Sequence, residues 1–338
     1  MSTQPSLEAF YASTIQPSFE ELDAERRALV ARMVQMGLLI GGLALVLGVV
    51  AVRFFGFPAL IFVVAIGFFI WLWQTGDQRM RYRSLFKERV IRAIVRFVGD
   101  DMRYAPDHTI SEGEYLASRI YLTDPDRYNG EDLISGTRGA TAFRFSEIHS
   151  EYKTESTDSK GRRQTHWHTI FKGIFFIGDF NKHFQGLTVV LPDTAERALG
   201  FIGKALQSWR GKLDTRQGEL VALEDPDFER AFVVYSTDQI EARYILSTSL
   251  MRRILEYKQR TGRDIALSFH DSQIYVALPS SKNHFEAPSV LTPIAQSMSL
   301  EQVRSYLEDL LLVVAIIDEL DLNTRIWSKQ SGGAVPNT

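Results

Sequence analysis

The stretch MVQMGLLIGGLALVLGVVAV, from Met33 to Val52, contains no charged residue. After Arg53, a second uncharged stretch of the same length follows, FFGFPALIFVVAIGFFIWLW, from Phe54 to Trp73. Twenty helical residues extend about 30 Å, which matches the hydrocarbon core of a bilayer. Soluble cores rarely contain two such adjacent stretches, and a cleaved signal peptide would not follow some thirty residues that include several acidic side chains. The sequence therefore predicts a transmembrane hairpin of two helices over residues 33–73.

Basic residues are distributed unequally around this hairpin. Arginines precede the first stretch and a longer basic run follows the second, whereas the turn carries only Arg53. The flanking basic residues are Arg26, Arg27, Arg32, Arg79, Arg81, Arg83, Lys87, Arg89, Arg92 and Arg96. Cytoplasmic flanks of transmembrane helices carry such an excess. We therefore expect the N-terminal segment 1–32 and all residues after the hairpin to lie in the cytoplasm.

The region 74–130 is predicted to be a basic juxtamembrane helix followed by a connector. Apolar residues recur at three- and four-residue steps through Val98, as expected for an amphipathic helix. Arg89, Arg92 and Arg96 are candidates for contact with anionic lipid headgroups, at roughly 1 kcal/mol each near the surface. Alternatively, these arginines serve only to fix the orientation of the hairpin.

Small residues recur every few positions in the first apolar stretch. Gly37, Gly41, Ala44 and Gly48 have the small-xxx-small spacing that lets helix backbones approach closely. The spacing is compatible with packing against the second helix and also with self-association between chains.

The remaining sequence, residues 131–330, is predicted to be a cytoplasmic α+β domain with a mainly antiparallel sheet and packed helices, possibly two subunits, 131–215 and 219–330. Strand-like runs flank a polar turn at Thr154 to Arg163, and another pair predicts a hairpin across His270 to Gln273. In the connector, Ser111 and Glu114 have the spacing of a capping box. Leu310 to Ile317 is too short to span a bilayer and indicates a buried core helix.

Composition excludes several functional classes. The formal net charge of −3 argues against a nucleic-acid partner, and the absence of cysteine excludes disulfides, thiolate metal sites and a cysteine nucleophile. The sequence contains no P-loop, nucleophile elbow, zincin or Rossmann fingerprint. We therefore expect no cofactor and favour a binding module over an enzyme.

A histidine-rich hairpin is the best candidate for chemistry. If the polar turn reverses about Asp158 and Ser159, His149 faces His168 and Glu151 faces His166, with all four side chains on one face. Imidazoles and a carboxylate in this arrangement could bind zinc or a similar ion. A slip of one residue would dissolve the cluster, and cross-strand polar pairs on a solvated face are the alternative interpretation.

Two further polar groups are candidates for a ligand or partner site. The first lies between apolar runs and comprises Asp179, Asn181, Lys182 and His183. The second directly follows a predicted strand and comprises Asp238, Glu241 and Arg243. Each also has a structural interpretation, an Asx-type turn for the first and a helix N-cap with a local ion pair for the second.

Several long segments carry a resemblance to a known family. They are GTRGATAFRFSEIHSEY (136–152), TIFKGIFFIGDFNKHFQGLTVVLPD (169–193), FVVYSTDQIEARYILSTSLMRRIL (232–255) and LNTRIW (322–327). Together with the two N-terminal apolar helices, they resemble the bacterial domain-of-unknown-function family 3137. The resemblance implies a bacterial membrane protein with a soluble domain and no agreed activity.

The leading hypothesis is a binding or scaffold module anchored in the bacterial cytoplasmic membrane, with both termini in the cytoplasm. Its expected partners are the membrane itself, anionic lipid headgroups and a membrane protein or a second copy of the chain. The alternatives are a metal-dependent hydrolase that uses the histidine hairpin and an accessory subunit of a transport complex.

Overall fold

The computed structural model describes residues 6–157, 161–180, 182–193 and 218–319. The chain forms two compact units, which we describe separately. Unit 1 comprises Met1–Asp100 and His284–Asp309, and unit 2 comprises Asp101–Asn283 and Leu310–Thr338. The segment His284–Asp309 thus groups with the N-terminal helices, although the sequence placed it in the 131–330 domain.

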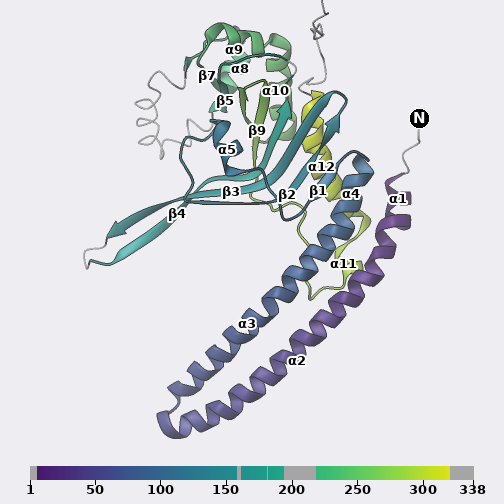
Figure 1. Ribbon diagram of the computed structural model, residues 1–338, viewed down its shortest axis with the longest axis vertical. Helices are drawn as coiled ribbons and strands as arrows, with labels where there is room; N and C mark the ends of the chain where they lie inside the picture. The colour runs from purple at the N-terminus through teal and green to yellow at the C-terminus, as the bar shows by residue number, and fades with distance from the viewer. Residues whose placement is uncertain (1–5, 158–160, 181, 194–217, 320–338) are drawn as a thin grey trace, which may run out of the picture. The chain divides into compact units, whose positions relative to one another are not determined.

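Unit 1 is helical, and two long apolar helices dominate it. Its helices up to residue 98 are α1 (Leu7–Phe10), α2 (Gln16–Phe55), α3 (Pro58–Phe86) and α4 (Arg92–Val98), with π-helical turns at Tyr11–Ile15 and Lys87–Ile91. The chain reverses at Gly56, whose φ of 78° suits glycine. As a result α2 and α3 run antiparallel, side by side (Figure 1).

Gly37, Ala44 and Gly48 of α2 face α3. A Cβ on Gly37 would lie 3.2 Å from the Trp71 indole nitrogen, and a Cβ on Gly67 would lie 3.3 Å from Ala44. A Cβ on Gly48 would meet Leu60 at 2.4 Å, whereas one on Gly41 would meet nothing within 4 Å. Three residues of the predicted stripe therefore pack within the hairpin, and Gly41 does not.

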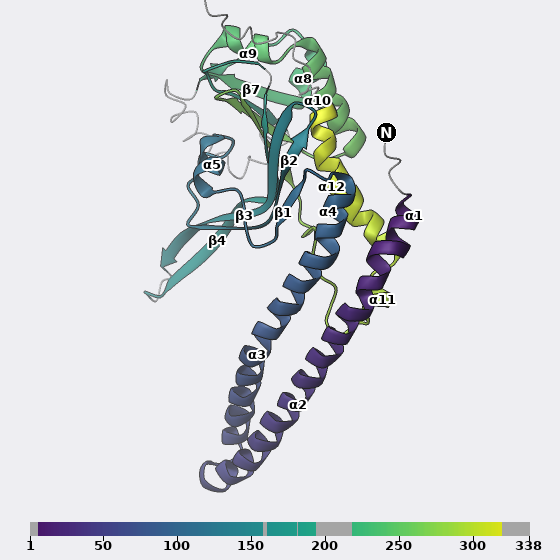
Figure 2. The same ribbon diagram turned by 45° about the vertical axis from the view of Figure 1, so that its right-hand side comes forward.

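The returning segment His284–Asp309 covers the apolar face of the first helices. It contains α11 (Ile294–Ser297) and the first half of α12 (Leu300–Glu319). The Tyr11 hydroxyl donates to the Met298 carbonyl at 3.0 Å, and Arg26 donates to the Val290 carbonyl at 3.2 Å. Figure 2 shows α11 beside α2. Ile294, Met298 and Val303 of this segment are buried.

Unit 2 contains a nine-stranded sheet of order β1-β2-β3-β4-β9-β8-β5-β7-β6, in which all the pairings described are antiparallel. The strands are β1 (Arg103–Ala105), β2 (Arg127–Arg138), β3 (Thr141–Thr157), β4 (Arg163–Asp179), β5 (Thr188–Pro192), β6 (Glu219–Leu220), β7 (Phe232–Ser236), β8 (Ala266–His270) and β9 (Gln273–Pro279). The helices are α5 (Glu112–Ala117), α8 (Pro226–Ala231), α9 (Gln239–Ile245) and α10 (Thr248–Thr261). The predicted α+β class is confirmed.

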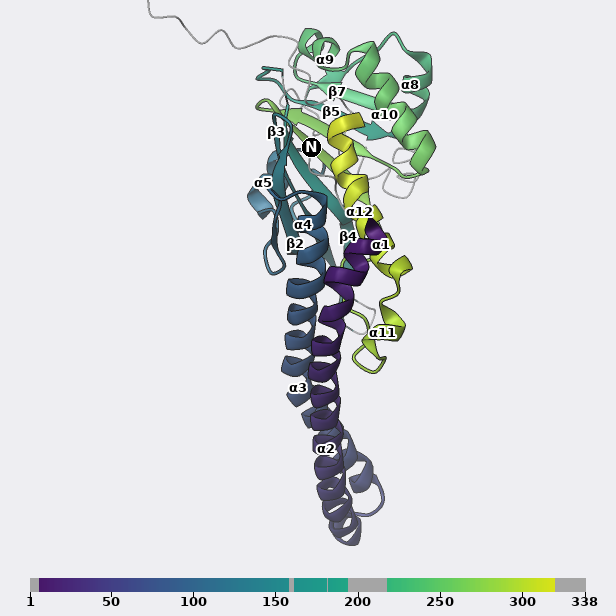
Figure 3. The same ribbon diagram turned by 90° about the vertical axis from the view of Figure 1, so that its right-hand side faces the viewer.

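Helices cover both faces of this sheet. Figure 3 shows α5 on one side and α10 with the C-terminal half of α12 on the other. Beneath α5, Tyr115 packs with Ile148, Phe171 and Phe175 in a buried cluster. The predicted capping box of Ser111 and Glu114 begins α5. The predicted core helix is also present, since Leu310, Val313, Ile316 and Ile317 are buried.

Candidate functional site

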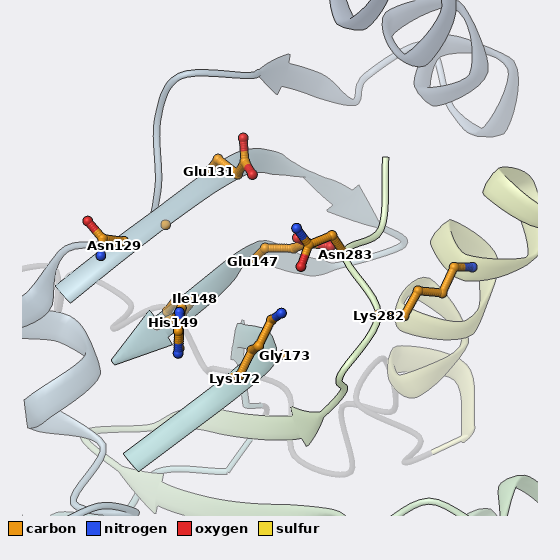
Figure 4. A pocket seen from close by; sticks show the side chains of 10 residues that line it. Asn129, Glu131, Glu147, Ile148, His149, Lys172, Gly173, Lys282 and Asn283 are labelled. Atoms are coloured by element: carbon orange, nitrogen blue, oxygen red, sulfur yellow. The ribbon is translucent and has the colours of Figure 1, made fainter. Parts of the chain in front are cut away.

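A polar pocket of about 300 Å³ opens beside the central strands of unit 2 (Figure 4). It is lined by Asn129, Gly130, Glu131, Glu147, Ile148, His149, Lys172, Gly173, Lys282 and Asn283. His149 on β3 lies opposite Lys172 on β4, and directly opposite residues of antiparallel strands point to the same face. Figure 4 shows these two side chains together and Lys282 pointing away from them.

Close backbone packing fixes two walls of the pocket. A Cβ on Gly130 would lie 2.1 Å from the Thr109 hydroxyl oxygen, and a Cβ on Gly173 would lie 2.1 Å from the Leu278 carbonyl oxygen. Gly173 also has a φ of 148°, which other residues rarely adopt. Both positions therefore require glycine.

A β-bulge brings three carboxylates together at this edge of the pocket. The register between β2 and β3 shifts between Glu131 and Ile134, and Asp132 in the bulge is buried with a φ of 62°. Carboxylate oxygens of Glu131, Asp132 and Glu147 lie within 4.8 Å of one another. Such oxygens suit a hard divalent cation. However, the Tyr104 hydroxyl donates to Asp132, and we assign no metal to the group.

The pocket suits a polar ligand that carries both signs of charge. Glu131 and Glu147 contribute carboxylates to the lining, and Lys172 contributes an ammonium group. Lys172 also donates to the Ser281 carbonyl at 3.3 Å. The residues that line the pocket, all of which the structure describes, include no hydroxyl or thiol nucleophile.

The predicted register of the histidine hairpin is wrong. Thr157 pairs with Arg163, so that His168 lies opposite Tyr152 and His166 lies opposite Thr154. The reversal involves Gly161, whose φ is 76°, and a bulge between Ser150 and Glu151 shifts the pairing again toward His149.

The four candidate ligands are therefore not brought together. His149 and Glu151 share one face, with 3.7 Å between the imidazole nitrogen and a carboxylate oxygen. By strand alternation, His166 and His168 point to the opposite face. His168 stacks on Tyr152 and shares a hydrogen bond of 2.9 Å with the Thr154 hydroxyl. The alternative interpretation of cross-strand polar pairs describes this hairpin better.

The segments that contain the two predicted polar groups contact each other. The Glu241 carboxylate accepts from the backbone N–H of Gln185 at 2.9 Å and of Gly186 at 2.7 Å. Lys182 donates to the last carbonyls of α9, at Tyr244 and Ile245, and burial lowers the pKa of its ammonium group. These contacts attach the turn between β4 and β5 to α9.

The other members of these groups have simpler environments. Asp238 is the N-cap of α9 and accepts from the backbone N–H of Ile240 and Glu241. Arg243 donates to the Ala222 carbonyl at 3.1 Å. Asp179 and His183 are exposed, and Asn181 lies outside the described residues.

Two of the three arginines predicted to face lipid form ion pairs. Arg89 pairs with Glu21, and Arg92 pairs with Glu88 at 2.6 Å. Arg96 is exposed. The polar pocket was not predicted from the sequence, although the alternation of Glu147, His149 and Glu151 along one strand indicates a polar face.

These features define an α+β protein with an N-terminal hairpin of two apolar helices and a polar, mixed-charge pocket in its sheet unit. The model of the family described as "Protein of unknown function (DUF3137)" matches residues 169–322. This match confirms the resemblance given by the sequence motifs.

Comparison with solved structures finds the crystal structure of the mycobacterial trehalose monomycolate transport factor A, TtfA. The two chains have 12% sequence identity and a TM-score of 0.33, and the match covers 67% of this chain and 94% of that chain. A TM-score this low supports no conclusion about fold or function. Comparison with curated proteins gives no match.

Proposed function

We propose that this protein is a binding module anchored in the bacterial cytoplasmic membrane by α2 and α3. The main support for this proposal is the exposure of the hairpin, because only 11% of the most apolar 18-residue segment of each helix is buried. Leu39 is 74% exposed and Phe62 is 71% exposed. Soluble monomers rarely expose contiguous apolar patches of more than a few hundred Å². Lipid contact would cover this surface.

Charge supports an orientation with both flanks in the cytoplasm. Near the turn at Gly56 the basic residue is Arg53, whereas the two opposite ends of the hairpin each carry several arginines. Both termini and unit 2 would then lie in the cytoplasm.

The partner surface that we propose lies on α9. Ile240 is 81% exposed and Tyr244, one turn later, is 44% exposed, so both share one helix face. Arg243 of the same helix is also exposed. An exposed apolar and aromatic face with arginine has the composition of a protein interface. We therefore propose a membrane-protein partner for this surface.

Reporter fusions test the anchoring. A reporter active only in the cytoplasm should work when it is fused after Gly99, and a periplasm-specific reporter should work when it is inserted next to Gly56. The chain should also stay in the membrane fraction after carbonate extraction. Activity of the periplasmic reporter after Gly99, or release by carbonate, would refute the proposal.

Photo-crosslinking tests the partner surface. A photoreactive residue at Ile240 should capture a membrane protein in native membranes, whereas one at the exposed Arg252 of α10 serves as the control. Binding of the purified, identified partner should then be lost in Ile240→Asp and retained in Arg252→Asp. Equal binding by both variants would refute the assignment to α9.

A further inference from the structure

A second cavity, of about 460 Å³, lies within unit 1, where the ends of the apolar stretches meet the segment Ala287–Leu291. Val34 and Gly37 of α2 line it together with Trp71 of α3. Its polar lining residues are Arg79, Tyr82, Arg83 and Ser289, and none of the lining residues is a carboxylate. The cavity is therefore apolar toward the hairpin turn and basic at the other end.

Trp71 forms a fixed wall of this cavity. Its indole N–H donates to the Met33 carbonyl at 3.0 Å. Gly37 allows this position, because a Cβ there would come within 3.2 Å of the indole nitrogen. The ring is thus held against α2.

Arg79 directs its charge toward the apolar end. It follows Trp71 by eight residues, about 12 Å along a helix axis, yet its guanidinium carbon lies 5.8 Å from the centre of the indole ring. Helical side chains lean toward the N-terminus of their helix, which for α3 is the direction of the apolar span. Among the described residues Arg79 forms no ion pair, whereas Arg83 pairs with Glu286.

Tyr82 supplies a second polar group without a partner. It is 1% exposed, and its hydroxyl has no hydrogen-bond partner among the described residues. A buried hydroxyl without a partner is unfavourable, because it has given up its hydrogen bonds to water. The hydroxyl oxygen is itself covered, so the rest of the Tyr82 side chain forms this part of the cavity wall.

We propose that this cavity binds one anionic phospholipid, with Arg79 at its phosphate group. This inference rests on the anchoring proposed above, which places the end of the span at Trp73. The headgroup layer is about 5–8 Å thick, and the guanidinium of Arg79 lies at that level because it reaches back toward Trp71. Val34 is 55% exposed and Leu291 is 73% exposed, and both offer apolar surface to the acyl chains.

Fluorescence quenching by brominated lipids tests the proposal. The full chain, with its other four tryptophans changed to Phe so that Trp71 alone reports, is reconstituted into nanodiscs. Brominated anionic and brominated zwitterionic lipids are compared at equal mole fractions. The anionic lipid should quench Trp71 more strongly. Arg79→Gln should reduce this preference about fivefold, which corresponds to the ~1 kcal/mol of one basic residue at an anionic surface.

Arg81→Gln is the matched control, since Arg81 is exposed, lies two residues away and does not line the cavity. It should retain the preference. Equal quenching of the parent protein by both lipids, or the same loss in both variants, would overturn the lipid site and leave the anchoring intact. Quenching by neither lipid would overturn the anchoring and the lipid site together.

Discussion

Glu241→Ala separates a structural role from a recognition role for the turn between β4 and β5. In the structure the carboxylate accepts two backbone hydrogen bonds, from Gln185 and Gly186. It does so from α9, and a Cβ on Gly186 would lie 2.4 Å from a Glu241 carboxylate oxygen. Removal of the carboxylate therefore leaves two N–H donors without an acceptor and detaches the turn from α9.

The expected loss follows from these two bonds. A hydrogen bond to a charged group contributes about 1.5–3 kcal/mol. Because Glu241 is only half-buried, water replaces part of each bond, and we expect a total of about 2–3 kcal/mol. For a domain of this size that loss lowers Tm by about 4–12 °C.

Thermal unfolding of the full chain in detergent, followed by circular dichroism, measures the effect. Glu241→Gln, which keeps one acceptor, should lose about half as much, and Ile240→Ala at the neighbouring exposed position should change Tm little. An unchanged Tm in Glu241→Ala would refute this reasoning and leave the carboxylate available to a ligand.

Three further predictions concern unit 1. Asp309 and His284 are buried, and a carboxylate oxygen of Asp309 lies 3.1 Å from the His284 imidazole nitrogen, so Asp309→Ala should lower the free energy of unfolding in urea by about 3 kcal/mol or more. The control is Asp318→Ala on the same helix as Asp309: it removes an exposed partner of Arg138 and should cost under ~1 kcal/mol. Burial raises the pKa of Tyr306 to about 12, above its usual value of 10.0, so the folded state retains a proton that the unfolded state releases. This contribution of Tyr306 to the free energy of unfolding should therefore be fully present below about pH 10 and decrease toward pH 12 by at most ~1.4 kcal/mol per pH unit. The decrease should be smaller in Tyr306→Phe, and identical alkaline unfolding of both proteins would contradict the assignment. A chain that begins at Asp101 lacks α1 and α2, so its uncovered α11 should bind a hydrophobic dye, and absence of dye binding would show that α2 does not cover this segment.

Local chemistry predicted the elements whose signals lie within a few residues of one another. The capping box at Ser111 and Glu114, the N-cap at Asp238 and the hairpin of β8 and β9 all occur where the sequence placed them. Gly262, with a φ of 62°, ends α10 as expected for a left-handed cap. Each of these depends on side chains that contact backbone in the same turn, so one sequence is sufficient to find them.

The candidate site was harder to predict because sheet register depends on single residues. A turn placed near Asp158 and a turn that involves Gly161 differ by only a few positions, yet the shift moved His166 and His168 to the face opposite His149. The bulge at Ser150 and the bulge at Asp132 each add a further irregularity. Neither has a sequence signal that distinguishes it from a regular strand, and the pocket beside Glu147 depends on both strands.

The arginines after the second apolar helix show the same limit at longer range. The pair of Glu88 and Arg92 lies at i and i+4 and is readable from the sequence, whereas Arg89 pairs with Glu21 of α2 and Arg83 with Glu286 of the returning segment. A carboxylate partner neutralises the field that an arginine presents to an anionic surface. A simple count of basic residues therefore overstates the attraction of this helix for lipid. Among the described arginines for which no ion pair is formed, Arg79 is the one that lies over the Trp71 ring at the end of the apolar span.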